Sequence, residues 1–123
     1  MQFLCLAYGN EADWKALRRE DQADLLAQDA LLRDRGALMG AVTTEVTSVR
    51  AWDGVAETKA EPFASAPRHL AGFSILEAES LEEAVRLVAN TPCARAKGAI
   101  EIRSIQMSNL ARMQRAGASI PDL

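Results

Sequence analysis

The sequence has few aromatic residues, few cysteines and a single histidine. Its 123 residues include three Phe, two Trp, one Tyr, two Cys and one His. Cys5 and Cys93 stand near opposite ends of the chain, so they form neither a CxxC redox motif nor a zinc knuckle. Two unpaired thiols favour a reducing compartment. We therefore expect a cytoplasmic protein that uses no metal and no cofactor.

Long apolar runs and blocks of like charge are also absent. No apolar run approaches the ~18 residues that a membrane span requires. The opening residues lack the basic segment of a signal peptide, and they fit a first β-strand better. The 14 basic and 17 acidic residues are spread along the chain, with a net charge of −3. Such a distribution offers no patch for nucleic acid, so we expect neither a nucleic-acid nor a membrane partner.

The remaining composition is that of one globular domain. Four Pro and seven Gly are too few for a disordered polymer, and 49% of the residues are hydrophobic. Twenty-three alanines indicate a core of small and aliphatic side chains. This length suits a single core. We assign that domain to residues 1–105 and a C-terminal tail to residues 106–123, which we expect to pack on a partner subunit.

Hydrophobic periodicity predicts four strands. Residues 2–8 are apolar on both sides, which is typical of a strand in the middle of a sheet. Residues 38–52 are rich in Val and Thr, and Val42, Thr44 and Val46 alternate as in a half-exposed strand. Asp53-Gly54 then favours a hairpin turn, and residues 55–69 read as a loop. Strands follow at 70–77 and 99–105.

Capping signals predict two helical stretches. Asn10 is a suitable N-cap for a helix that runs, with a break near residues 19–21, to Arg35, and Gly36 follows its end. We expect its buried side to include Trp14, Leu17, Leu25, Leu26, Ala30 and Leu32. Ser80 and Glu83 form a capping box that begins a second helix, which ends before Pro92. Its expected buried face consists of Leu81, Ala84, Val85 and Val88.

The resulting order is β-α-β-β-α-β, the pattern of a ferredoxin-like α+β fold with an antiparallel sheet. Both helices must cover one face of that sheet. The other face carries Leu4, Leu6 and Tyr8, and it is too apolar to remain in water. We therefore expect a homodimer in which two such faces meet, as in a dimeric α/β barrel.

Several segments resemble the YCII-related, DGPF-type family. They are the opening residues 3–12, Pro62-Phe63-Ala64, the run 69–73, the helix of residues 81–90 with its following Pro92, Ala94 and Arg95, and the closing residues 99–103. The resemblance covers about residues 2–105. It implies a ferredoxin-like fold that dimerises through its sheet. Many such proteins are encoded beside extracytoplasmic-function sigma factors, so the resemblance also implies a bacterial, regulatory setting.

The sequence departs from this family in its signature loop. Ala60-Glu61 replaces the Asp-Gly that precedes Pro-Phe, and Ser65-Ala66-Pro67 replaces Glu-Thr-Lys. The loop has thus lost a carboxylate, a glycine turn and a lysine. Related YCII proteins are suspected of using a His–Asp pair in a cleft, whereas His69 is the one histidine here and no matching dyad exists.

His69 is the natural candidate for a general base, because imidazole titrates near neutral pH. The alternative is a surface histidine at the end of a loop. Glu101 and Arg103 share one strand face. Arg103 can anchor a carboxylate or phosphate, with Arg50 as a second cation from a neighbouring strand, or it can form an ion pair with Glu101.

Other candidate ligand contacts surround this face. Tyr8 can place its hydroxyl at the mouth of a cleft, or it can be an ordinary sheet residue with a wet tip. Arg68 is a further possible anchor. The loop of residues 55–69, with Pro62 and Phe63, is a candidate ligand lid.

The sequence predicts that neither cysteine is a nucleophile. We expect Cys5 to be a small, buried hydrophobic residue. Cys93 follows Pro92 at what we expect to be the C-terminal end of a helix, where the dipole would raise its pKa.

Two functions remain open. The first is a small dimeric ligand-binding or regulatory module without a working catalytic set. The second is a cofactor-free enzyme that acts on a small acidic metabolite, with His69 as base and Arg103 or Arg68 as anchor. No Gly-rich phosphate loop, HExxH motif or Ser-centred elbow occurs in the sequence.

Overall fold

The computed structural model describes residues 1–106 and contains one four-stranded sheet, a separate two-stranded hairpin and a layer of helices. In chain order the elements are β1 (Gln2–Gly9), α1 (Glu11–Lys15), α2 (Arg19–Asp34), β2 (Leu38–Ala41), β3 (Ser48–Arg50), β4 (Glu57–Lys59), β5 (His69–Glu77), α3 (Leu81–Val88), α4 (Pro92–Arg95) and β6 (Ala99–Ser104). The predicted tail of residues 106–123 lies, apart from its first residue, outside the described residues.

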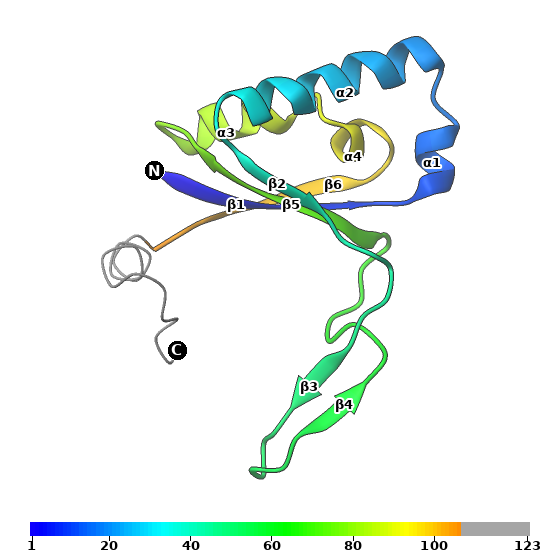
Figure 1. Cartoon of the computed structure of the whole chain (residues 1–123), viewed down its shortest axis with the longest axis vertical. Coiled ribbons are helices and arrows are strands. Elements are labelled where there is room, and N and C mark those ends of the chain that lie inside the picture. Colours follow the sequence, from blue (N-terminus) through cyan, green and yellow to red (C-terminus); the bar gives the residue numbers. More distant parts are fainter. Residues whose placement is uncertain (107–123) are drawn as a thin grey trace.

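The main sheet has the strand order β2-β5-β1-β6, and each neighbouring pair is antiparallel. β1 therefore lies between two partners, as its two apolar sides predict. Helices α2, α3 and α4 lie together on one side of this sheet (Figure 1). This arrangement confirms the predicted ferredoxin-like fold, with the hairpin of β3 and β4 inserted between the second and third strands of the pattern.

Local capping explains where the helices begin and end. The backbone N–H of Asp13 donates to Oδ1 of Asn10 over 2.8 Å, and that of Glu83 donates to Oγ of Ser80 over 3.1 Å. These bonds satisfy amide groups that a helix start leaves without partners. Gly36 follows α2 with a φ of +95°, which glycine adopts without strain. The predicted break in the first helical stretch falls just earlier, between α1 and α2.

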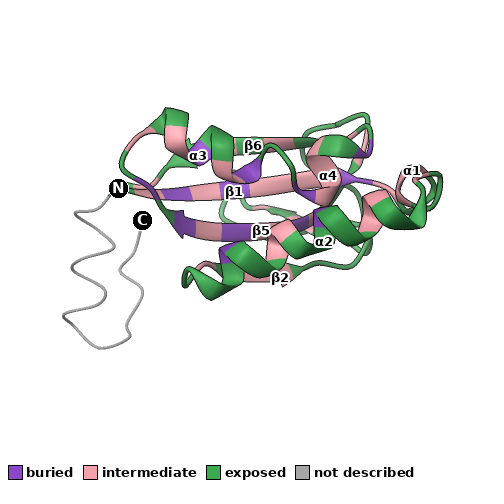
Figure 2. Ribbon diagram, turned by 90° about the horizontal axis from the view of Figure 1, so that it is seen from above, coloured by how far each residue is buried: buried purple, intermediate pink, exposed green. Residues whose placement is uncertain are grey.

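The core lies between the sheet and the helices (Figure 2). Phe3 and Cys5 point into it from β1, and Leu76 points into it from β5. Ala84 and Val88 of α3 cover them, while Leu25 and Leu32 of α2 are buried nearby. Most of the buried hydrophobic side chains are small or aliphatic, as the abundance of alanine predicts.

Four apolar residues expected on the buried helix faces are exposed. Leu26 of α2 is 53% exposed, and Leu81 and Val85 of α3 are 52% and 47% exposed. Ala30 of α2 is exposed as well. The buried stripe of each helix is narrower than the pattern predicts, because each helix packs on the sheet through one line of residues.

The prediction of one strand over residues 38–52 is wrong. β2 ends at Ala41, and Val42, Thr44 and Val46 are exposed and lie outside any strand. Alternating β-branched residues favour an extended chain, but a strand also needs a partner. The pairing of β2 with β5 ends at Ala41 and Gly72, and after the bond from the N–H of Val42 to the carbonyl oxygen of Ala71 the chain leaves β5, so residues 43–47 lie in no strand pair in the described part of the chain.

The prediction that residues 55–69 form a loop is also wrong in part. Glu57–Lys59 is the strand β4, which pairs with β3 in register Arg50↔Glu57. The Asp53-Gly54 turn is confirmed, and Gly54 has a φ of +89°. This hairpin extends away from the main sheet on the side opposite the helices (Figure 1).

Candidate functional site

The face of the main sheet away from α2, α3 and α4 is the first candidate site. Cross-strand pairs share a face, and Leu4 pairs with Ile75 while Leu6 pairs with Phe73. We call this surface the open sheet face. Its apolar residues are Leu4, Leu6, Tyr8, Leu38, Leu70, Phe73 and Ile75. None of them is buried, and Leu38 is 62% exposed. Among the described residues, no helix covers this face (Figure 1).

Glu101 and Arg103 of β6 join the same face, opposite Leu6 and Leu4. Nε of Arg103 donates to Oε1 of Glu101 over 2.9 Å, and both side chains are exposed. The ion pair that the sequence offered as the alternative is therefore present along the strand. It occupies the Nε–H that a bound anion would otherwise use.

Tyr8, Arg68 and His69 gather at one end of the sheet. β1 and β5 shift register after Ala7, and the resumed pairing sets Tyr8 opposite Leu70 and Gly9 opposite His69. His69 is exposed. Nε of Arg68 donates to Oδ2 of Asp13 over 2.7 Å, so this cation is held against α1.

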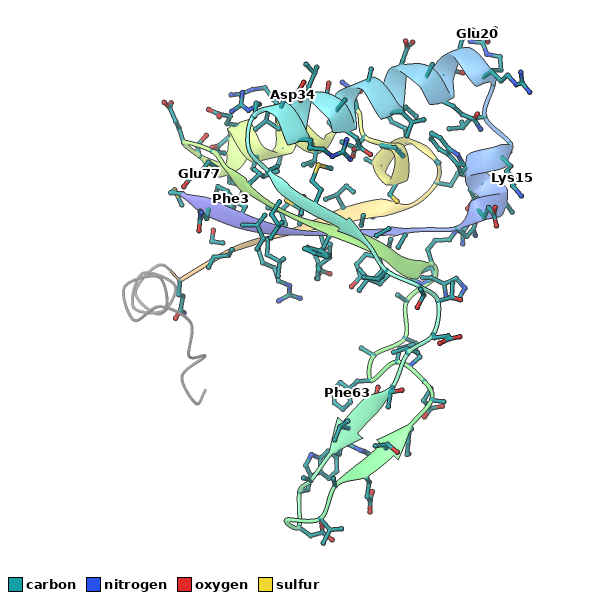
Figure 3. The ribbon with its side chains drawn as sticks, viewed as in Figure 1. Phe3, Lys15, Glu20, Asp34, Phe63 and Glu77 are labelled. Atoms are coloured by element: carbon teal, nitrogen blue, oxygen red, sulfur yellow. The ribbon has the colours of Figure 1, made fainter. Side chains whose placement is uncertain are left out.

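Arg50, Pro62 and Phe63 lie on or beside the hairpin, not on the main sheet. The guanidinium carbon of Arg50 lies 4.6 Å from the centre of the Trp52 ring. Phe63 is 79% exposed and lies beside the hairpin, away from the helix layer (Figure 3). The expectation that Arg50 comes from a strand neighbouring Arg103 is wrong, because the chain leaves the main sheet before β3 begins.

A cavity of about 380 Å³ lies on the helix side of the sheet and was not predicted. Its walls come from β1, β2, β5 and β6 below and from α2, α3 and the segment around α4 above. We call it the helix-side cavity. Its apolar lining residues are Cys5, Ala7, Leu32, Met39, Gly40, Ala41, Ala71, Gly72, Phe73, Val88, Pro92 and Ile100. Small side chains on the strands leave this volume open.

Four polar side chains approach the helix-side cavity from its upper wall: Asp29, Arg33, Thr91 and Cys93. A fifth, Ser74, belongs to β5. Burial raises the pKa of Asp29, and the charge of Arg33 opposes that rise. The Thr91 hydroxyl donates to the carbonyl oxygen of Val88 over 2.6 Å.

The position of Cys93 on its helix, and the reason why its pKa is raised, both differ from the prediction. It lies in the first turn of α4, which Pro92 begins, and not at the C-terminal end of a helix. Its thiol pKa is raised first by burial and second by the negative charge of Asp29. Burial also raises the pKa of Cys5, which is a core residue as predicted.

The sequence does contain one signal for this cavity. Asp29 stands four residues after Leu25 and three before Leu32, so it shares the buried stripe of α2. A carboxylate in an apolar stripe marks a place where burial is functional or compensated. The small lining residues give no such signal, because they are distant in sequence and common elsewhere in the chain.

Within residues 1–106, no group of three or more His, Cys, Asp or Glu side chains could hold a metal ion. No helix in that part of the chain is long and apolar enough to cross a membrane.

Comparisons with known proteins agree with this architecture. The sequence profile of the YCII-related domain matches residues 1–109. No curated protein matches the chain. Among solved structures, it is similar to 5-chloro-2-hydroxyhydroquinone dehydrochlorinase from Burkholderia phenoliruptrix, in complex with 2,5-dihydroxybenzoquinone. The TM-score is 0.51 and the identity 20%, covering 86% of this chain and 94% of that one. At this identity the likeness supports the fold alone.

Proposed function

The chain belongs to the YCII-related family, and on that premise we propose that it is a small dimeric ligand-binding module. The helix-side cavity binds a small, largely apolar organic molecule, and the open sheet face joins two copies. The cavity is the observation that carries this function. The two cysteines of the chain are free thiols, which supports a cytoplasmic location for the protein.

The size and lining of the cavity support ligand binding. Small-molecule sites have volumes of roughly 300–1,000 Å³, with apolar walls and a few polar groups that orient the ligand. The helix-side cavity, at about 380 Å³, falls within that range, and four of its five polar residues lie on the helix side. The opposite wall includes Ala7, Ala71 and Gly72, and its polar member is Ser74.

The open sheet face supports the dimer. Contiguous exposed apolar side chains on a sheet are typical of an interface between proteins. A second copy, turned face to face, would cover Leu4, Leu6 and Phe73 in each subunit. The hairpin extends on this same side of the sheet (Figure 1), where it would flank the partner. A regulatory role would then follow if the ligand changed how two subunits meet.

A thermal-shift screen of a metabolite library tests the ligand-binding function. A ligand that binds the folded state must raise its Tm. Ala7→Leu places extra carbon atoms in the cavity and should abolish the shift caused by any true ligand. Ala27→Leu, at an exposed position of α2, should leave the shift unchanged. Equal shifts in the two variants would place the ligand elsewhere and contradict the proposal.

The second candidate function is a cofactor-free enzyme for a small acidic metabolite, with His69 as general base. The solved structure similar to this chain is named a dehydrochlorinase, and loss of hydrogen chloride needs a group that accepts a proton. Arg68, the neighbour of His69 in the chain, would supply the positive charge that holds the acid, because Arg103 pairs opposite Leu4, toward the other end of β1 from Gly9, the partner of His69. His69→Gln should then abolish the turnover of small carboxylates, which mass spectrometry measures. Unchanged turnover would remove His69 from the reaction.

A further inference from the structure

We propose that Asp29 is the recognition group of the helix-side cavity, and that it selects uncharged, ring-sized ligands that carry a hydroxyl hydrogen-bond donor. This inference rests on the ligand-binding function proposed above, and it names the chemical class that the cavity takes. Phenols are the simplest members of that class.

The position of Asp29 turns its carboxylate toward the cavity. Leu25 and Leu32 lie on the same stripe of α2, and both are buried against the sheet. Asp29 stands between them and lines the cavity together with Cys93, whose thiol feels its charge. The carboxylate is therefore at the inner wall of the cavity and not on the outer surface of the helix.

The carboxylate lacks a hydrogen-bond partner within residues 1–106. None of the side-chain hydrogen bonds or ion pairs in that part of the chain involves Asp29. Arg33, one turn further along α2, is exposed and forms no ion pair with Asp29 there. Asp29 is half-buried, so its carboxylate has lost part of its hydration, which is unfavourable for a charged group. A hydroxyl group on a ligand would supply the missing donor.

The other groups of the cavity narrow the ligand further. The Thr91 hydroxyl already donates to Val88, so its oxygen is left as an acceptor. Asp29 and Arg33 both line the cavity, so a ligand of either charge would meet a like charge, and a strongly polar ligand would lose hydration against Leu32 and Ile100. The remaining class is uncharged and has one apolar body and one hydrogen-bond donor, for which a hydroxyl group is the simplest choice.

Three probes of similar size separate these chemistries. 4-Methylphenol has a hydroxyl donor, 4-fluorotoluene has none, and 4-methylbenzoate carries a negative charge. Their Kd values are measured by NMR titration of the full chain. The wild-type protein should bind 4-methylphenol about ten-fold more tightly than 4-fluorotoluene, since a hydrogen bond to a charged acceptor is worth about that factor. It should bind 4-methylbenzoate most weakly.

Variants assign this preference to one side chain. Asp29→Ala should bind 4-methylphenol and 4-fluorotoluene with equal Kd, while its Kd for 4-fluorotoluene stays at the wild-type value. Asp29→Asn keeps a carbonyl acceptor and should retain part of the preference. Asp24→Ala, at an exposed position of the same helix, should keep all of it.

The outcomes separate the inference from the function beneath it. Equal binding of 4-methylphenol and 4-fluorotoluene by the wild-type protein, or a preference that survives in Asp29→Ala, overturns the role of Asp29 but leaves ligand binding intact. Tightest binding of 4-methylbenzoate overturns it as well, and points to Arg33. No saturable binding of any probe contradicts the ligand-binding function itself.

Discussion

The backbone of Gly98 lies directly against the carbonyl oxygen of Tyr8. A Cβ at position 98 would overlap that oxygen and would lie 2.8 Å from the carbonyl oxygen of Cys93. The N–H of Gly98 donates to this second oxygen over 3.1 Å. The contact joins the turn after α4 to the end of β1, beside the helix-side cavity. Glycine is required here for lack of space.

Gly98→Ala should therefore destabilise the fold. Backbone atoms cannot move aside as the end of a flexible side chain can, so we expect a loss of about 2 kcal/mol in the free energy of unfolding. Urea denaturation followed by circular dichroism measures it. Ala99→Ser, at the next and exposed position, should change stability by less than about 0.5 kcal/mol. A Gly98→Ala variant as stable as the wild type would show that the turn has room to shift.

Elements with strong local signals could be predicted from the sequence. β1 is apolar on both sides and lies in the middle of the sheet, while Asn10 and Ser80 cap the helices that follow them. Each of these signals depends on residues within a few positions. The ferredoxin-like order follows from them because a split β-α-β pattern has few ways to fold.

The hairpin and the cavity could not be predicted in the same way. Residues 42–47 have the composition of a strand, but the chain leaves the edge of β5 there even though β5 continues to His69, so composition alone does not fix the pairing. The helix-side cavity depends on strand positions being Ala or Gly across from a carboxylate on α2. Whether small strand residues lie opposite this carboxylate depends on the register of the sheet and on the position of α2. Neither can be predicted from a local sequence pattern.

Charges placed on the open sheet face should dissociate the proposed dimer. Leu38 and Leu70 are exposed on that face, so the double variant Leu38→Glu/Leu70→Glu leaves the monomer core intact. Like charges brought together across a symmetric interface repel each other. Sedimentation equilibrium should give twice 13.3 kDa for the wild type and 13.3 kDa for the variant.

The matched control places the same two charges on the helix layer. Leu26→Glu/Leu31→Glu alters two exposed leucines of α2 and should sediment as the wild type does. A wild-type protein that stays at 13.3 kDa at micromolar concentration would refute the dimer.

The ion pair between Arg68 and Asp13 should contribute to stability. Nε of Arg68 lies 2.7 Å from Oδ2 of Asp13, and the side chains of Arg68 and Asp13 are 33% and 18% exposed. A double-mutant cycle with Arg68→Met and Asp13→Asn should give a coupling of about 1 kcal/mol. The pair Arg18–Asp21, exposed on the surface, should couple by less than about 0.5 kcal/mol. Equal couplings would mean that partial burial adds nothing.

The pH dependence of stability should report the burial of Asp29. Burial raises the pKa of Asp29 in the folded protein above its ordinary value. The stability that Asp29 contributes is therefore complete while the carboxyl group is protonated, and it is lost as the pH rises through the folded pKa. Asp29→Asn removes this loss. The variant should be more stable than the wild type at pH 7, and the difference should vanish below about pH 3.9, the unfolded value.

Urea unfolding at several pH values measures this difference. Asp24→Asn, at an exposed position of α2, should show little change across the same range. An Asp29→Asn variant that is less stable than the wild type at pH 7 would contradict the account of a carboxylate that burial disfavours.

The most direct test of the ligand-binding function is an NMR map of the full chain titrated with the tightest ligand found in the metabolite screen. The account predicts saturable shifts of backbone amides concentrated at Ala7, Leu32, Val88, Cys93 and Ile100, which line the helix-side cavity. Shifts concentrated instead at Leu4, Leu6 and Ile75, or on the hairpin, would contradict it.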